Sequence, residues 1–217
     1  MPLYLKETAP LMGIWKVEES SDHLLSMLEN TSDYLPFLER VQFEHRKREW
    51  LAVRVLLKEL LGEESLIAYY DDGAPCLSAK DLNISISHTK DYVAVLLSPR
   101  LPVGIDIEYR GKRILNVRSR FLSEEESDFI DAKQEIEHLL ICWCAKETLF
   151  KVMRQQEVDF IRHLHLLPFP YNTSGSLTGT ETRTQQAAAY HLNYRVFDDF
   201  VLAFTTELSE GHRMNQS

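Results

Sequence analysis

The chain has 217 residues, 44% of them hydrophobic, which fits one large folded domain or two small ones. Its formal net charge of -9 argues against a general nucleic-acid binder, because such proteins usually carry a basic excess. No apolar run approaches the roughly 20 residues of a membrane span, and the N-terminus lacks the plan of a signal peptide. We therefore expect a soluble, cytoplasmic protein with neither nucleic acid nor membrane as a partner.

The first part of the chain contains a predicted strand and a long predicted helix. Residues 12–17 form the strand, and the polar stretch that follows, through residues 32–36, is expected to be irregular. Residues 42–61 show a helical periodicity, with Gly62 just past the end as a C-cap. This helix is basic within an acidic protein. Its basic residues are Arg46, Lys47, Arg48, Arg54 and Lys58.

Alternating hydrophobicity next predicts a run of short strands. Residues 83–87 and 92–97 read as a hairpin, and residues 103–109 as a further strand. A three-stranded antiparallel meander of these segments would place Ser87 and His88 near the ends of neighbouring strands.

Beyond Tyr109 the chain turns basic and then helical. Ser123 and Glu126 have the spacing of a capping box, and a longer helix is predicted over residues 136–153. The basic residues of the segment that precedes these helices are Arg110, Lys112, Arg113, Arg118 and Arg120.

The last part of the chain reads as a loop followed by a hairpin. The Thr-, Ser- and Gly-rich stretch up to Thr180 is predicted to be a loop, and residues 187–196 and 200–206 to be paired strands. Both halves thus combine a helix with antiparallel strands. We expect an α+β protein with two similar subdomains, residues 1–102 and 103–208, and a flexible tail at 209–217.

Two acidic motifs carry the strongest chemical signal. In the predicted strand at 103–109, Asp106 and Glu108 project from one face, because strand residues two apart share a face. In the helix, Trp143, Glu147 and Lys151 recur at intervals of four and share a face.

Three carboxylates are a suitable set for Mg²⁺, which prefers oxygen ligands and also binds substrate phosphates. Each motif alone also fits a simpler interpretation. Asp106 and Glu108 then belong to a solvated strand face, and Glu147 and Lys151 form a surface ion pair. If the motifs act together, Lys146, Lys151 and His88 are candidates for neutralising a bound pyrophosphate. The basic helix at 42–61 is then a candidate for holding a further phosphate.

The chain resembles the single-chain, surfactin-synthetase-activating type of the 4'-phosphopantetheinyl transferase superfamily. The resemblance rests on four ordered segments: Arg-Glu-Trp-Leu-Ala-Val-Arg at 48–54, Gly-Ala-Pro at 73–75, Ile-Ser-His at 86–88, and the two acidic motifs. It implies two α+β subdomains related by a pseudo-two-fold axis, with coenzyme A bound in the cleft between them. The N-terminal subdomain would bind the nucleotide, and the C-terminal one the metal.

The resemblance also implies a role for each matching residue. Asp106, Glu108 and Glu147 would hold Mg²⁺, and Glu147 would also be the candidate base for a serine of the carrier protein. Lys151 would contact the pyrophosphate. The further coenzyme A contacts would come from Arg48, Arg54, Gly73, Pro75, Ser87, His88 and Lys146.

The implied reaction moves the phosphopantetheine arm of coenzyme A to an acidic acyl or peptidyl carrier protein and releases adenosine 3',5'-bisphosphate. The basic segment at 110–120 would then be a docking surface for the carrier. One departure concerns Ala74, because family members often have lysine between the glycine and proline of that turn. The alternatives are a scaffold that binds coenzyme A or a carrier without catalysis, and a Mg²⁺-dependent phosphodiesterase. We expect a monomer, since one chain supplies both subdomains.

Overall fold

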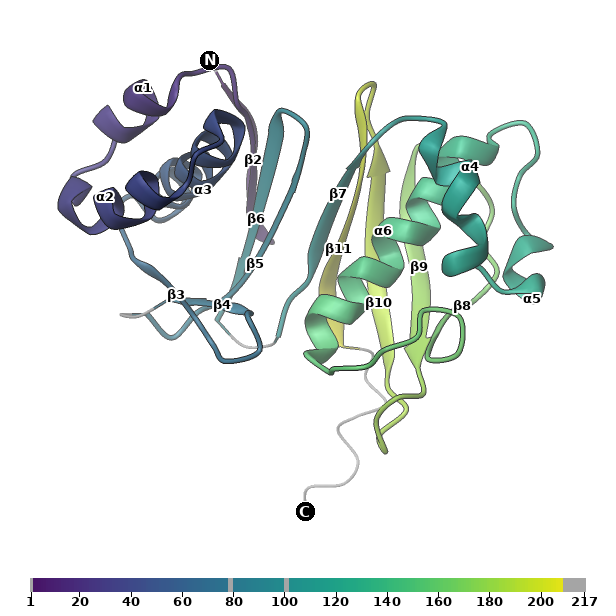
Figure 1. The fold of residues 1–217 in the computed structure, drawn as a ribbon. Helices are drawn as coiled ribbons and strands as arrows, with labels where there is room; N and C mark the ends of the chain where they lie inside the picture. The colour runs from purple at the N-terminus through teal and green to yellow at the C-terminus, as the bar shows by residue number, and fades with distance from the viewer. Residues whose placement is uncertain (1, 78–79, 100–101, 209–217) are drawn as a thin grey trace. The chain divides into compact units, whose positions relative to one another are not determined.

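The structure is a computed structural model that describes residues 2–77, 80–99 and 102–208. The chain divides into two compact units, Met1–Arg100 and Leu101–Ser217 (Figure 1). Each unit combines helices with antiparallel strands, which confirms the predicted mixture of helices and antiparallel sheets. The pseudo-two-fold relation between the units stays a prediction.

In the first unit, one sheet has the strand order β1-β2-β6-β5, and β3 and β4 form a separate pair. Helix α3 packs on β2 and β6 of the larger sheet. The elements are β1 (Leu3–Thr8), β2 (Leu11–Lys16), α1 (Ser21–Ser26), α2 (Thr31–Arg40), α3 (Glu44–Leu61), β3 (Ile67–Tyr69), β4 (Pro75–Leu77), β5 (Asn83–Thr89) and β6 (Tyr92–Ser98).

Helix α3 confirms the predicted helix at 42–61, although it begins at Glu44. Gly62 ends it in the left-handed conformation, with φ of 74°, and donates its N–H to the Lys58 carbonyl. The helix approaches β2 closely at Gly13, because a Cβ there would lie 2.8 Å from Leu56 Cδ1. A buried helix face and a small strand residue thus fix α3 against the sheet.

The prediction that residues 32–36 are irregular is wrong, because these residues belong to helix α2. Tertiary packing explains the helix. The Phe37 ring stacks on Trp50 of α3 with centroids 4.2 Å apart and planes 12° apart, and Tyr34 meets the same indole edge-on. Aromatic contacts of this kind override a weak local propensity.

In the second unit, the sheet has the strand order β7-β11-β10-β9-β8, and α6 packs across β7, β11 and β10 (Figure 1). The elements are β7 (Ile105–Tyr109), α4 (Arg113–Val117), the 3₁₀ helix η1 (Arg118–Arg120), α5 (Glu124–Ser127), α6 (Glu135–Met153), β8 (Leu164–Leu166), β9 (Ser174–Glu181), β10 (Ala189–Val196) and β11 (Phe200–Leu208).

The predicted meander is wrong, because β6 pairs with β5 and β2 and leaves no edge for β7. Strand β7 instead pairs with β11, so that Asp106 lies opposite Ala203. The predicted loop up to Thr180 is also wrong, because it contains β9, which pairs with β10. The C-terminal hairpin of β10 and β11 is confirmed, as is the capping box at Ser123.

The predicted tail at 209–217 lies outside the described residues. Over the ranges that the structure describes, we find no helix with the length and apolar character needed to span a membrane.

Candidate functional site

Strand β7 and helix α6 bring the two acidic motifs together. The Lys151 ammonium lies 2.8 Å from Asp106 Oδ1 and donates a further hydrogen bond of 2.9 Å to the Ile105 carbonyl. About two turns towards the start of α6 from Lys151, the Trp143 indole N–H donates to Glu108 Oε1 at 2.9 Å. The row of residues at intervals of four on α6 therefore faces the two carboxylates of β7.

Glu147 lies between Trp143 and Lys151 in sequence, and the charges of Asp106, Glu108 and Lys151 act on its carboxylate. Burial, and then the negative charge of Asp106, raises the pKa of Glu147 to about 7, while Lys151 opposes the shift. Burial and Asp106 also raise the pKa of Glu108. The three carboxylates therefore interact as like charges, and a cation placed among them would relieve the repulsion.

The donor set fits a hard divalent cation by its chemistry. Carboxylate oxygens are the ligands that Mg²⁺ prefers, and like charges at a partly buried position favour a cation. In the part of the chain that the structure describes, however, no three acidic, histidine or cysteine side chains are already arranged to hold a metal ion. Asp106 forms an ion pair with Lys151 instead, so these side chains must move before a metal ion can bind.

Lys146 does not join this cluster. Its side chain is completely buried, and its ammonium donates to the carbonyls of Phe121 and Phe160 at 2.6 and 3.0 Å and to Glu126 Oε2 at 2.6 Å. All three of its donors are therefore used within the protein. The predicted phosphate contact does not fit this position, because a bound phosphate would have to displace a buried ion pair.

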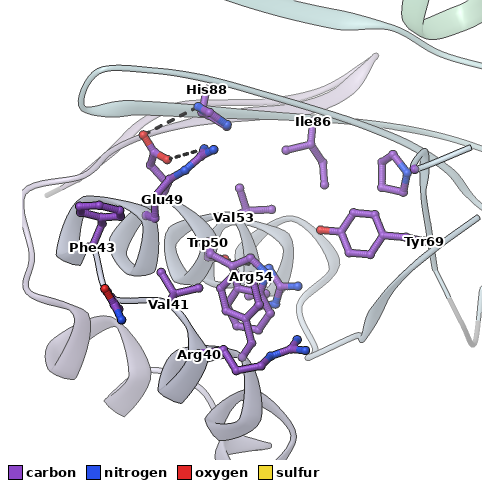
Figure 2. Close-up of a pocket in the computed structure, with 15 residues that line it drawn as sticks. Arg40, Val41, Phe43, Glu49, Trp50, Val53, Arg54, Tyr69, Ile86 and His88 are labelled. Atoms are coloured by element: carbon purple, nitrogen blue, oxygen red, sulfur yellow. Dashed lines mark hydrogen bonds and ion pairs between the residues drawn. The ribbon is translucent and has the colours of Figure 1, made fainter.

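The first unit contains a pocket of about 680 Å³ between α2, α3, the β3–β4 turn and β5 (Figure 2). Four of the predicted coenzyme A contacts line it, namely Arg54, Gly73, Pro75 and His88. The residues that sequence reasoning missed there are Phe37, Arg40, Val41, Gln42, Phe43, Arg46, Glu49, Trp50, Val53, Tyr69 and Ile86.

Two predicted contacts of the first unit do not line the pocket. Arg48 donates to the Val17 carbonyl and, at 2.7 Å, to the Glu19 carbonyl, and so ties α3 to the chain after β2. Ser87 is buried in β5, with only 7% of its surface exposed. The basic run on α3 predicted cations at a ligand site, but Arg46 and not Arg48 lines the pocket, because the Arg48 guanidinium is bound by the Val17 and Glu19 carbonyls.

Arg54 is the deepest cation of the pocket. Only 4% of its surface is exposed, and its guanidinium carbon lies 3.0 Å from the centroid of the Trp50 ring (Figure 2). Its NH1 donates to the Trp50 carbonyl at 2.8 Å, whereas its buried Nε has no hydrogen-bond partner among the described residues. Burial lowers the pKa of Arg54 to about 10, which still leaves it charged at neutral pH.

Glu49 contacts both Arg46 and His88 at the pocket. Its Oε2 lies 3.4 Å from Arg46 NH1, and its Oε1 lies 3.8 Å from His88 Nδ1 (Figure 2). Exposed aromatic rings stand at the rim, with Phe43 67% and Tyr69 54% exposed. Aromatic surfaces beside guanidinium groups suit a flat, negatively charged ligand such as a nucleotide.

Residues 102–205 match the family model described as the 4'-phosphopantetheinyl transferase superfamily. The match covers just under half of the chain. The matched segment contains β7 and α6 with the whole acidic cluster, whereas the pocket of the first unit lies outside it. The predicted superfamily is thus confirmed, and the surfactin-synthetase-activating type stays a prediction.

Curated relatives carry the same name. The 4'-phosphopantetheinyl transferase AcpT of Escherichia coli K12 is 31% identical over 112 residues, which cover 49% of this chain and 57% of that protein. The AcpT proteins of Salmonella typhimurium and Salmonella typhi are 31% identical over 112 residues and 42% identical over 64 residues, covering 49% and 29% of this chain. They are covered to 58% and 33% of their own lengths. The matched part of the chain thus spans little more than half the length of the first two relatives and a third of the last.

Within the phosphopantetheinyl transferase domain, the basic segment follows β7 directly. Lys112, Arg113 and Arg120 are exposed. Arg110 pairs with Glu137 and also donates to the Asp198 carbonyl, and Arg118 lies 3.0 Å from Glu135. Glutamates at the start of α6 therefore neutralise part of the positive charge of this segment.

Gly104 sets the distance between β7 and α6, and its substitution gives a first prediction. A Cβ at Gly104 would lie 2.4 Å from the Thr148 carbonyl oxygen and 2.8 Å from Val152 Cγ2. We expect Gly104→Ala to lower the free energy of unfolding by about 1–3 kcal/mol, because backbone must move to admit the methyl group. Urea denaturation measures this, with Gly111→Ala as the control, since nothing lies within 4 Å of a Cβ there. Equal effects of both substitutions would contradict the close approach.

The raised pKa of Glu147 gives a second prediction, for the protein in EDTA. The pKa of Glu147 is about 7 in the folded state and about 4.5 in the unfolded chain, so the folded state binds the extra proton between these values. Its contribution to stability is therefore present below about pH 4.5 and lost as the pH rises towards 7. Allowing for partial exposure, we expect a loss of about 1–2 kcal/mol. Unfolding at pH 5 and pH 7.5 should show a steeper fall for the wild type than for Glu147→Gln, and parallel curves would count against it.

Proposed function

We propose that the protein transfers the 4'-phosphopantetheine arm of coenzyme A to a serine hydroxyl of an apo acyl or peptidyl carrier protein. Adenosine 3',5'-bisphosphate is the other product. The observation that carries the proposal is the row of Trp143, Glu147 and Lys151 facing Asp106 and Glu108, within a segment that matches this superfamily. The pocket of the first unit adds a second place for a negatively charged ligand.

In this proposal, Asp106, Glu108 and Glu147 hold Mg²⁺, which would supply charge neutralisation at the pyrophosphate. The ion pair between Lys151 and Asp106 then opens, and the Lys151 ammonium contacts the pyrophosphate oxygens. Glu147 accepts the proton of the serine hydroxyl, directly or through a water molecule, and its pKa near 7 suits a base at neutral pH.

The serine oxygen forms a bond to the phosphorus that carries the pantetheine. The bridging P–O bond of the pyrophosphate breaks, and its electron pair leaves with adenosine 3',5'-bisphosphate.

The pocket beside α3 is proposed to take the nucleotide end of coenzyme A. Arg46 and Arg54 supply positive charge, His88 supplies an imidazole ring, and Trp50 and Tyr69 supply aromatic surface. The turn contributes shape and no positive charge, because Gly73 has φ of 83° and the side chain of Ala74 is a methyl group. The backbone N–H of Ala74 donates to Asp72 within the turn. The nucleotide is therefore held from α3 and not from the turn.

The basic segment is proposed to dock an acidic carrier protein. We expect Arg113→Glu with Arg118→Glu to raise the KM for carrier about tenfold or more at low salt and to leave the KM for coenzyme A nearly unchanged. The matched control reverses two exposed cations of the same unit, Lys133 and Arg162. Equal changes in both KM values, or an equal effect of the control, would remove the docking role.

Intact mass spectrometry tests the proposed function itself. The protein is incubated with coenzyme A, Mg²⁺ and an apo acyl or peptidyl carrier, and the carrier is expected to gain roughly 340 Da, the phosphopantetheine addition. Binding alone cannot make this covalent change, so the assay separates a transferase from a non-catalytic scaffold. Cleavage of DNA or RNA in place of carrier modification would instead favour a phosphodiesterase.

A further inference from the structure

The Trp143 indole, which donates to Glu108 Oε1 at 2.9 Å, is itself packed against two phenylalanine rings. The Phe121 ring meets the indole edge-on with centroids 5.1 Å apart, and the Phe160 ring packs on it at a tilt with centroids 5.6 Å apart. Phe121 follows η1 and is completely buried, whereas Phe160 lies between α6 and β8 and is half-buried. Two segments outside β7 and α6 thus reach the acidic cluster through Trp143.

Lys146 fixes the backbone of both phenylalanines. Its buried ammonium donates to the Phe121 carbonyl at 2.6 Å and to the Phe160 carbonyl at 3.0 Å, and it pairs with Glu126 at 2.6 Å. Lys146 lies three residues after Trp143 on α6, so about one turn of helix carries both the indole and the ammonium that holds its two neighbours. A displacement of either segment from Trp143 would therefore break a buried hydrogen bond of Lys146.

The contact with Trp143 orients Glu108 without neutralising it. An indole N–H is a neutral group that only donates, so the carboxylate keeps its negative charge and its other lone pairs. Asp106 is held differently, because the Lys151 ammonium brings a positive charge that competes with a cation. Glutamate has a long, flexible side chain, and fixing its orientation in advance lowers the entropy lost when it binds. Groups that hydrogen-bond to a ligand carboxylate in this way raise the affinity of metal sites.

We propose that Phe121 and Phe160 are positioning residues for the reaction, because they hold the Trp143 indole so that Glu108 keeps the orientation in which it binds the cation. This inference rests on the proposed function of the acidic cluster, and it adds two side chains that act through another residue. It predicts that loss of either ring weakens cation binding only as far as the indole N–H contributes to that binding. Phe160 is the residue to test, because Phe121 lies in the core, where loss of a ring costs more stability.

Binding of Mn²⁺ to the full chain, followed by electron paramagnetic resonance of the free ion, tests the inference without turnover. Mn²⁺ accepts the same oxygen ligands as Mg²⁺. Trp143→Phe keeps an aromatic ring and removes the N–H, and we expect it to raise the Kd about tenfold or more. Phe160→Leu should raise the Kd roughly threefold or more, because the indole is held less firmly. Phe129→Leu is the matched control, since Phe129 is also half-buried in this unit but packs on His138 and Phe169.

The double variant with Trp143→Phe and Phe160→Leu distinguishes positioning from general packing. If Phe160 acts through the indole N–H, its loss should add nothing once the N–H is gone, and the double variant should bind Mn²⁺ as Trp143→Phe does. Effects of the two substitutions that multiply in the Kd would overturn the inference. An equal rise of the Kd in Phe129→Leu would do the same, since it would trace the effect to a general loosening of the unit.

The metal readout separates this inference from the function on which it rests. If the wild type binds Mn²⁺ and Phe160→Leu binds it equally well, the phenylalanines position nothing, and the acidic cluster stands as the metal site. If the wild type binds no Mn²⁺, the cluster itself is not a metal site, and the inference falls with that part of the proposed function. A lower Tm in Phe160→Leu with an unchanged Kd shows packing alone and also overturns the inference.

Discussion

Glu147→Gln is expected to lower kcat for phosphopantetheine transfer by roughly 10³-fold or more, because one substitution removes both the proposed metal ligand and the candidate base. The amide keeps the size of the side chain and loses its negative charge. Glu147 is partly buried and makes no hydrogen bond that holds β7 to α6, since Trp143 and Lys151 make those contacts. The fold should therefore survive, and the Tm should stay the same or rise as repulsion with Asp106 is relieved.

The control for this experiment is Glu125→Gln, an exposed residue of α5 that carries the same change of charge. Transfer is measured by intact mass of the carrier over time, at saturating coenzyme A. Mg²⁺ is also titrated, because loss of a ligand should raise the concentration needed for half-maximal rate. Near-normal turnover by Glu147→Gln would show that Glu147 is neither ligand nor base, even if the transferase activity of the wild type stands.

The acidic cluster could be predicted from sequence because it depends on local periodicity alone. A spacing of two places Asp106 and Glu108 on one side of a strand, and a spacing of four places Glu147 and Lys151 on one side of a helix. Gly104 then permits the two elements to approach closely. No long-range information is needed beyond the fact that this strand and this helix pack together.

The pocket of the first unit could be predicted only in part, because its shape depends on tertiary packing. Arg40 lines it through α2, a helix that is held on α3 by the Phe37–Trp50 stack and contains Pro36, a residue that argues against a helix in the sequence. The choice between Arg46 and Arg48 depends on where the chain after β2 crosses α3, since the Val17 and Glu19 carbonyls capture Arg48. Local patterns do not contain that crossing.

Lys146 shows the same limit for the second unit. It stands next to Glu147 in sequence, which made a phosphate contact plausible, but adjacent residues of a helix point about 100° apart. The side chain is therefore directed away from the acidic cluster. It pairs there with Glu126. Glu126 belongs to the capping box that the sequence predicted correctly, but the sequence did not reveal that this residue is also the partner of Lys146.

The buried pair of Lys146 and Glu126 makes the largest stability prediction. Lys146→Met leaves the Glu126 carboxylate without its counter-ion in the core, where it also accepts the N–H groups of Ser123 and Leu166 at 2.9 Å. We expect the free energy of unfolding to fall by about 3–5 kcal/mol, the usual cost of breaking a buried ion pair on one side. Urea denaturation measures the loss, and Lys112→Met, at an exposed position, is the control.

A double variant distinguishes the loss of the pair from the loss of a phosphate contact. Glu126→Gln added to Lys146→Met should recover part of the stability, because no unpaired charge remains and the amide oxygen still accepts a backbone N–H. If Lys146 instead bound the pyrophosphate, the single variant would keep its stability and raise the KM for coenzyme A. Glu126→Gln would then change neither quantity in the Lys146→Met background. The effect of Glu126→Gln on the free energy of unfolding in the Lys146→Met background therefore decides whether Lys146 supports the helix that carries Glu147 or contacts the substrate.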